Sequence, residues 1–232
     1  MTSESKDART LAAEIPWLAV LTDAERDRAW NSLRFAAADA GTLVCRQGER
    51  IAGWLGVLDG LVRVASTDQS GCTTTITGVL AGGWFGEGTV LKREPCRFHA
   101  QALSRSQLAI LPVEAFHALL DNSIRFNRLV MDQLNERLSH FIGAREWERL
   151  RRPDLRVACQ LAQLHNPVLH PRAGTVVKLR QQELADLAGL SRQCVNRSLA
   201  QLQVRGLVRV QYGGVQVLDA AALAREVRTG HG

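Results

Sequence analysis

The chain has 232 residues, of which 46% are hydrophobic and 22% are charged. This composition is typical of a globular protein, and the length allows one large domain or two small ones. No stretch approaches the roughly 18 consecutive apolar residues of a membrane helix, and the polar beginning MTSESKDART lacks the apolar run of a signal peptide. We therefore expect a cytoplasmic protein that does not act at a membrane.

Positive charge is concentrated near the end of the chain. The formal net charge is +6, and residues 154–232 contribute +5 of it, because they hold ten Arg and Lys against five Asp and Glu. A basic segment beside a nearly neutral one indicates a polyanionic partner. The five cysteines are far apart and form no CxxC pair, so we expect reduced thiols and no metal or disulfide framework.

In chain order, short helices are expected first and a β domain second. Residues 10–35 have a helical pattern, with Thr22 or Asp23 as a cap. From about residue 40 to 112, runs of Val, Ile, Thr and Leu alternate with glycine turns, which predicts a small β barrel or roll. A short helix then leads to a long helical segment over residues 124–150.

The long helix carries an apolar seam. Met131, Leu134, Leu138 and Phe141 follow a 3-4-3 spacing, which is the pattern of a coiled coil. Because the helix is long and its other faces are heavily charged, we favour a seam shared between two copies of the chain. The alternative is an amphipathic helix that lies on its own β-roll.

Pro153 interrupts the helical pattern and marks a domain boundary, because proline lacks the backbone donor that a continuing helix needs. Beyond it the pattern predicts a helix, a short strand and two further helices. A hairpin about Gly213 and Gly214 follows, and a final helix is expected over residues 219–228.

The segment QQELADLAGLSRQCVNRSLAQL, residues 181–202, predicts a helix-turn-helix. Leu184 and Leu187 form the apolar stripe of its first helix, and Gly189 permits the tight turn. Ser191 can cap the second helix through its hydroxyl.

Four long polar side chains follow that cap: Arg192, Gln193, Asn196 and Arg197. At 100° per residue they fall within an arc of about 140°, apart from the aliphatic side chains of the same helix. Arginine pairs with guanine and Gln or Asn with adenine in the major groove, and residues at the start of a second helix reach the bases. The predicted DNA-binding residues are Ser191, Arg192, Gln193, Asn196, Arg197 and Arg180.

In this order the parts resemble the cyclic-AMP receptor protein / fumarate-nitrate regulator (CRP/FNR) superfamily of bacterial transcription regulators. The resemblance covers residues 15 to 228 or so. It rests on GGWFGEG, the long helix, the break at Pro153, SRQCVNR and the hairpin GLVRVQYGGVQVLD. It implies a homodimer formed through the long helix, with two recognition helices on a near-palindromic site. Gln193 stands where members often have Glu, so we expect a different half-site.

The expected fold class is α+β, with three parts. They are a cyclic-nucleotide-binding-like β-roll (jelly roll) sensor with short flanking helices over residues 1–123, a long dimerisation helix over residues 124–152, and a winged helix-turn-helix DNA-binding domain over residues 153–232.

The resemblance also places an effector pocket in the roll. Cyclic-nucleotide binders hold the ribose with a Gly-Glu pair and the cyclic phosphate with an Arg that precedes Ser or Thr. Gly86, Glu87 and Arg97 match this pattern, but Phe98 replaces the hydroxyl residue. A guanidinium suits a phosphate, yet the ligand would lose one donor and some space.

The long helix departs from the cyclic-AMP pattern as well. Phe141 and Ile142 stand where cyclic-AMP binders place a Thr-Ser pair. Each ligand polar group left unpaired would cost about 1–3 kcal/mol, so we do not expect cyclic AMP to be the effector. Glu87 and Arg97 then either form an internal ion pair or serve another effector, such as cyclic di-GMP or an aromatic metabolite.

No cofactor is predicted, although haem held by a lone Cys or His of the roll stays open. The oxygen-sensing branch of the family would need an N-terminal cysteine cluster, and residues 1–35 contain no Cys. We predict a transcription regulator and no enzyme, with double-stranded DNA, a second copy of the chain and RNA polymerase as partners. The rival hypothesis is a ligand-binding regulatory subunit that acts on a protein partner.

Overall fold

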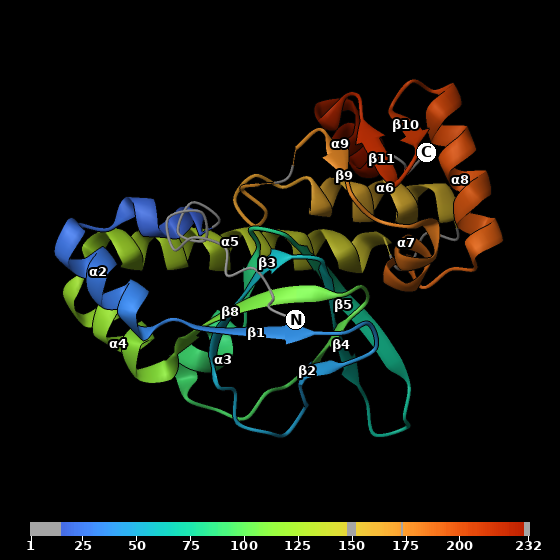
Figure 1. Cartoon of the computed structure of the whole chain (residues 1–232). Coiled ribbons are helices and arrows are strands. Elements are labelled where there is room, and N and C mark those ends of the chain that lie inside the picture. Colours follow the sequence, from blue (N-terminus) through green and yellow to red (C-terminus); the bar gives the residue numbers. More distant parts are fainter. Residues whose placement is uncertain (1–14, 148–151, 173, 230–232) are drawn as a thin grey trace, which may run out of the picture.

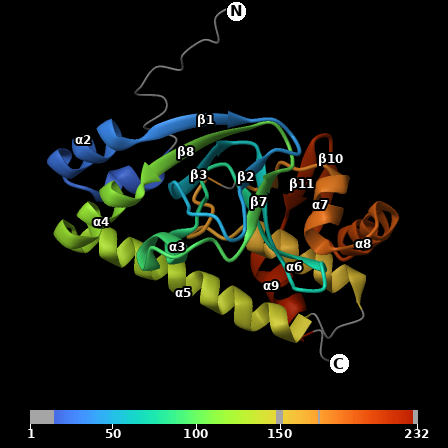
Figure 2. The ribbon, with the colours of Figure 1, turned by 90° about the horizontal axis from the view of Figure 1, so that it is seen from below.

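The computed structural model describes residues 15–147, 152–172 and 174–229 (Figure 1). A β-roll with its N-terminal helices lies on one side of the long helix α5 (Ile124–Trp147), and a smaller C-terminal unit lies near the far end of that helix. Figure 2, seen from below, shows α5 running along the side of the roll toward the C-terminal unit.

The N-terminal part combines short helices with eight strands. In chain order the elements are η1 (Pro16–Val20), α2 (Asp23–Ser32), β1 (Arg34–Ala38), β2 (Leu43–Cys45), β3 (Gly53–Asp59), β4 (Leu61–Thr67), β5 (Thr73–Leu80), β6 (Trp84–Phe85), α3 (Glu87–Lys92), β7 (His99–Ala102), β8 (Ser106–Pro112) and α4 (Val113–Asn122). Thr22 is the cap of α2, as predicted: Thr22 Oγ1 accepts from Glu25 N at 3.4 Å, and Glu25 Oε2 accepts from Thr22 N at 2.8 Å.

The strands form two four-stranded antiparallel sheets, in the orders β1-β8-β3-β6 and β2-β7-β4-β5. The predicted roll is therefore confirmed. An aromatic cluster anchors the start of α5 to it: Phe126 of α5 lies 5.6 Å from Trp17 and 5.7 Å from Trp54, measured between ring centroids. Trp54 in turn lies 4.6 Å from Trp84. These buried rings hold the long helix against the roll.

The first strand begins earlier than the sequence pattern indicated. Arg34–Ala38 forms β1, although residues up to 35 were predicted to be helical. Its first four side chains are exposed, so it shows no alternation of apolar and polar residues. Backbone pairing with β8 holds it, from Arg34 opposite Ile110 to Ala38 opposite Ser106.

The C-terminal unit contains a helix-turn-helix and a hairpin, as predicted. Its elements are α6 (Pro153–Leu164), β9 (Val176–Val177), α7 (Gln181–Ala188), α8 (Arg192–Val204), β10 (Val208–Gln211), β11 (Gly214–Val217) and α9 (Ala220–Thr229). Pro153 is the first residue of α6, where its missing N–H costs nothing. Gly189 ends α7 with a φ of +61°, which glycine adopts without strain.

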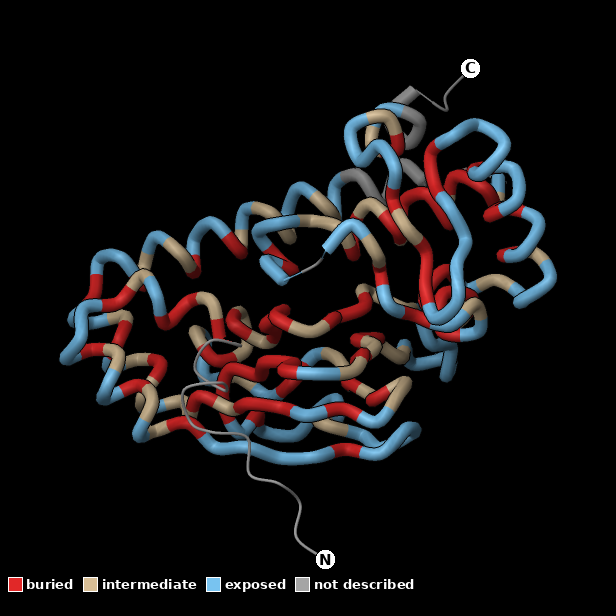
Figure 3. Tube along the Cα trace, turned by 45° about the horizontal axis from the view of Figure 1, so that its top comes forward, coloured by how far each residue is buried: buried red, intermediate tan, exposed pale blue. Residues whose placement is uncertain are grey.

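The C-terminal unit is seated on strand β5. Leu80 belongs to the hydrophobic core of the C-terminal unit, and Thr75 Oγ1 donates to the backbone oxygen of Asp186 at 3.2 Å. A Cβ atom at Gly78 would lie 2.8 Å from Leu187 Cδ1, so α7 approaches the strand closely. Figure 3 shows buried residues both in the roll and in this unit, whereas the outer turns of α5 are mostly exposed.

Candidate nucleic-acid interface and effector cavity

Helix α8 keeps its aliphatic side chains inside. Ser191 caps it as predicted, because Ser191 Oγ accepts a hydrogen bond from Cys194 N at 3.2 Å. Val195, Leu199 and Leu202 are buried in the C-terminal core. Burial of these three side chains fixes which face of α8 points outward.

The outward face carries the predicted base-reading residues. Arg192, Gln193, Asn196 and Arg197 are all exposed. Neither arginine forms an ion pair within the described part of the chain. Figures 1 and 2 both place α8 at the outer edge of the C-terminal unit, away from the roll. The structure thus brings these four side chains together on an open surface.

Arg180 and the hairpin lie on either side of this helix in the sequence. Arg180 precedes α7, its side chain is exposed, and its backbone N donates to Glu183 Oε2 at 2.6 Å. The hairpin is joined to α8, because Gln203 Oε1 accepts from Val210 N at 2.9 Å. Tyr212 at the hairpin tip is fully exposed.

A carboxylate at the start of α6 holds the far end of α8. Asp154 Oδ2 accepts hydrogen bonds at 2.9 Å from both Arg205 Nη2 and Arg152 Nη2. Burial by itself raises the pKa of Asp154, but the two guanidinium groups outweigh it and lower the pKa overall. The sequence patterns did not reveal this contact, because Asp154 and Arg205 are 51 residues apart.

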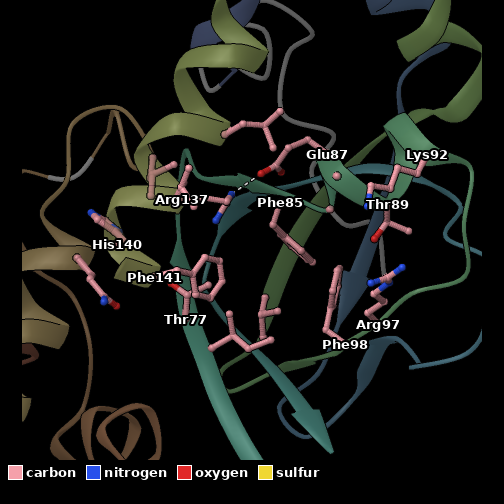
Figure 4. Close-up of a pocket in the computed structure, with 18 of the residues that line it drawn as sticks. Thr77, Phe85, Glu87, Thr89, Lys92, Arg97, Phe98, Arg137, His140 and Phe141 are labelled. Atoms are coloured by element: carbon pink, nitrogen blue, oxygen red, sulfur yellow. Dashed lines mark hydrogen bonds and ion pairs between the residues drawn. The ribbon is translucent and has the colours of Figure 1, made fainter. Parts of the chain in front are cut away.

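Five of the six predicted effector residues line one cavity of about 380 Å³ (Figure 4). They are Gly86, Glu87, Arg97, Phe98 and Phe141. Ile142 is the exception: it does not line the cavity, and 60% of its surface is exposed. On a helix, neighbouring residues point about 100° apart, so Phe141 and Ile142 do not share a face.

Glu87 and Arg97 do not pair with each other, which corrects the internal ion pair considered for them. Glu87 Oε1 instead pairs with Arg137 Nε of α5 (Figure 4). Arg137 Nη2 also donates to the backbone oxygen of Trp84. Arg97 Nη2 donates to Glu94 Oε2 at 3.0 Å. Sequence patterns missed Arg137, although its position one helical turn before Phe141 was a usable signal.

Aromatic rings occupy space around this ion pair. Phe85 and Phe98 lie 6.3 Å apart between ring centroids, and Phe141 enters from α5. Gly86 has a φ of +89°, and a Cβ there would lie 2.7 Å from Ile51 Cδ1. The cavity therefore combines an internal ion pair with apolar walls.

The predicted seam residues of α5 do not share one environment. Met131 and Leu138 are 54% and 57% exposed, although Leu138 also borders the cavity. Leu134 is partly buried against the roll core and lines the cavity, and Phe141 is half-exposed and also lines it.

An exposed apolar stripe does run along α5, but its membership differs from the predicted seam. It consists of Ile124, Met131, Leu138 and Ile142. Spacings of seven, seven and four residues keep these side chains on one helix face.

Comparisons with known proteins agree with this arrangement. Residues 37–123 match the model of the cyclic nucleotide-binding domain, and residues 155–226 match the Crp-like helix-turn-helix domain. The chain is 33% identical over 171 residues to the transcriptional regulator SdrP of Thermus thermophilus, covering 72% of this chain and 80% of that protein. The chain belongs to the CRP/FNR superfamily.

Other CRP/FNR proteins support the same assignment. The cyclic AMP receptor protein of Thermus thermophilus is 32% identical over 179 residues, covering 72% of this chain and 76% of that protein. The crystal structure of a catabolite activator protein from Thermus thermophilus has 28% identity and a TM-score of 0.51, covering 94% of this chain and all of that one. The two matched CRP/FNR regions contain the roll side of the cavity and all of α8, respectively.

In the described part of the chain, no helix is both long and apolar enough to cross a bilayer. The described residues also contain no group of three or more His, Cys, Asp or Glu side chains placed to hold a metal ion.

Proposed function

We propose that this protein is a homodimeric, sequence-specific DNA-binding transcription regulator. The observation that carries the proposal is the exposed row Arg192, Gln193, Asn196 and Arg197 on the capped first half of α8. Such side chains at the start of a second helix read base edges in the major groove. The net charge of +5 over residues 154–232 favours a polyanion.

The roles of the side chains follow from their chemistry. Arg192 and Arg197 each present a fork that matches guanine O6 and N7, whereas the amide of Gln193 matches adenine N6 and N7. Arg180 is a phosphate contact that orients α7 and α8 on the duplex. RNA polymerase is the protein partner of the DNA-bound dimer.

The dimer forms through the exposed stripe of α5, with Met131 and Leu138 at its centre. In a single copy this apolar surface is in contact with water. When two copies pair, their stripes bury each other, and this burial stabilises the dimer. Two copies related by a two-fold axis place two α8 helices on a near-palindromic site, one helical turn of DNA apart.

The effector of the roll is a ligand other than cyclic AMP. Arg137 already engages the Glu87 carboxylate, and Phe98 supplies no hydroxyl for a cyclic phosphate. The cavity favours a ligand with an apolar body, and its binding biases how α5 and the C-terminal unit pack.

The function is tested by DNA binding with the full chain. Selection from a random pool of duplexes should return a near-palindromic sequence. Its affinity should fall by about three to five powers of ten between 50 and 200 mM salt if six to ten phosphates are contacted. Absence of DNA binding, with binding to a protein partner instead, would favour the rival regulatory subunit.

The substitution Arg197→Ala tests base reading. We expect a loss of about 1–3 kcal/mol for the selected sequence, together with relaxed discrimination at one position of each half-site. Arg125→Ala, on the exposed start of α5, is the matched control and should leave both quantities unchanged. If Arg197→Ala instead lowers the affinity for every DNA sequence by the same factor, Arg197 is a phosphate contact.

A further inference from the structure

The effector cavity is bounded by the C-terminal unit as well as by the roll. Most of its walls come from the roll and from α5, but Gln163 lies on α6 and Leu169 lies in the loop that follows α6. Helix α6 packs directly against α8. A ligand in this cavity would therefore contact the sensor and the DNA-binding unit of one subunit at the same time.

Glu87 and Gln163 line the cavity, and each has a buried side-chain oxygen, Oε2 and Oε1 respectively, without a hydrogen-bond partner among the described residues. The two residues are 2% and 7% exposed. An unpaired buried polar atom costs about 1–3 kcal/mol, and native proteins leave few of them. Because both oxygens are acceptors, a ligand with a hydroxyl or amine donor would satisfy them.

The charges around the cavity favour an anion. The cavity is lined by three basic side chains, from Lys92, Arg97 and Arg137, and by two carboxylates, from Glu87 and Glu94. Arg137 pairs with Glu87 and Arg97 with Glu94, whereas Lys92 forms no ion pair within the described part of the chain. One positive charge is thus left at the edge of the cavity, where it can meet a carboxylate.

The remaining walls fit a flat apolar body. Three aromatic rings border the cavity, from Phe85, Phe98 and Phe141 (Figure 4). Aromatic rings pack against one another in tilted and offset arrangements. A volume of about 380 Å³ accommodates one ring with a short side chain.

We propose that the cavity binds a small aromatic carboxylate that carries a hydrogen-bond donor, and that Gln163 accepts this hydrogen bond. The proposal rests on the proposed function and adds the class of effector and a residue that responds to it. Gln163 is a specificity residue here, because it touches the ligand and distinguishes a donor-bearing ring from a bare one.

The position of Gln163 explains how such a ligand would reach the DNA-binding surface. Gln163 lies in the last turn of α6 and Asp154 in its first turn. Asp154 holds Arg205 at the end of α8, and the backbone oxygen of Gln163 lies 3.2 Å from His170 Nδ1. A shift of α6 at its ligand end would move one rigid helix, and with it the support of α8.

The test uses two matched probes, para-coumarate and cinnamate, which differ only in a phenol hydroxyl. Calorimetric titration of the full chain should give about tenfold tighter binding of para-coumarate, as expected for one buried hydrogen bond. Gln163→Leu should bind both probes alike and keep its affinity for cinnamate. Gln160→Leu, on the same helix but not lining the cavity, should keep the wild-type preference.

DNA binding by the same proteins separates this proposal from the function on which it rests. Para-coumarate should change the DNA affinity of the wild type, and Gln163→Leu should need about tenfold more para-coumarate for the same change. Equal binding of both probes, a preference that survives Gln163→Leu, or no binding of either at millimolar concentration would overturn the proposal. Sequence-specific DNA binding in those cases would still uphold the function. Cyclic AMP serves as the negative ligand and should give no heat.

Discussion

His170 is a buried histidine between the two units. It is 3% exposed, its Nδ1 lies 3.2 Å from the backbone oxygen of Gln163, and a Cβ at Gly83 would lie 2.8 Å from its Cδ2. Burial, helped by nearby Arg137, lowers the pKa of His170 to about 3. The ring is therefore neutral in the folded protein.

The lowered pKa of His170 predicts that the folded protein becomes less stable in acid. Between pH 6.5 and about 3, His170 is protonated in the unfolded chain but neutral in the folded chain. The free energy of unfolding therefore falls as the pH falls through this range. At pH 5 the loss from this group is about 2 kcal/mol relative to pH 7. His170→Asn keeps a donor near the carbonyl but cannot titrate. Urea unfolding at both pH values should show a correspondingly smaller loss, and an unchanged loss would assign the sensitivity to other groups.

At the scale of elements, α8 depends on a contact from outside the helix-turn-helix. Asp154 Oδ2 accepts from Arg205 and Arg152, and its side chain is only 10% exposed. We expect Asp154→Asn to lower the free energy of unfolding by about 1.5–3 kcal/mol, because the hydrogen bonds lose their charge. DNA affinity should fall as well, since the end of α8 is less firmly held.

Asp219→Asn is the matched control for this prediction. Asp219 lies near Arg225 at 3.9 Å, and both side chains are more than half exposed, so its ion pair contributes little. Thermal melts and anisotropy titrations would measure both variants. Loss of stability in Asp154→Asn without loss of DNA affinity would show that the contact does not position α8.

Elements and caps were predictable where their causes are local. The hydroxyl of Ser191, the φ of Gly189 and the outward face of α8 depend on neighbours within one or two helical turns, so residue spacing indicated them. Strand β1 escaped prediction because its support is backbone pairing with a distant strand. The pairing of Glu87 with Arg137 also joins distant parts of the chain, 50 residues apart. The position of Arg137 one turn before Phe141 indicated the face of α5 on which it lies, but not its partner.

The cavity, too, could be predicted only where its residues are close together in the sequence. The family pattern indicated its roll side, from Gly86 to Phe98, because those residues are adjacent in the sequence. Gln163 could not be found in that way, because it reaches the cavity only after α6 docks beside the roll. The seam of α5 was predicted from periodicity alone, and tertiary packing then turned Leu134 inward and left Ile124 and Ile142 exposed.

At the scale of the whole molecule, different parts of α5 have three different surroundings. Its start is fixed by the aromatic cluster, its middle lines the cavity through Leu134 and Arg137, and its outer stripe is open. A ligand that shifts α5 or α6 would therefore change the cavity, the proposed dimer contact and the support of α8 together.

The exposed stripe of α5 is the proposed dimer interface. Leu138→Glu places a charge among apolar side chains that would be buried between two copies, and burying an unpaired charge is costly. We expect this variant to be monomeric in analytical ultracentrifugation while its melting temperature stays near that of the wild type. Its affinity for a two-half-site duplex should fall by about 100-fold or more, because the second half-site no longer binds at high effective concentration. Ser139→Glu, exposed on a neighbouring face, should remain dimeric, and a dimeric Leu138→Glu would exclude this stripe as the interface.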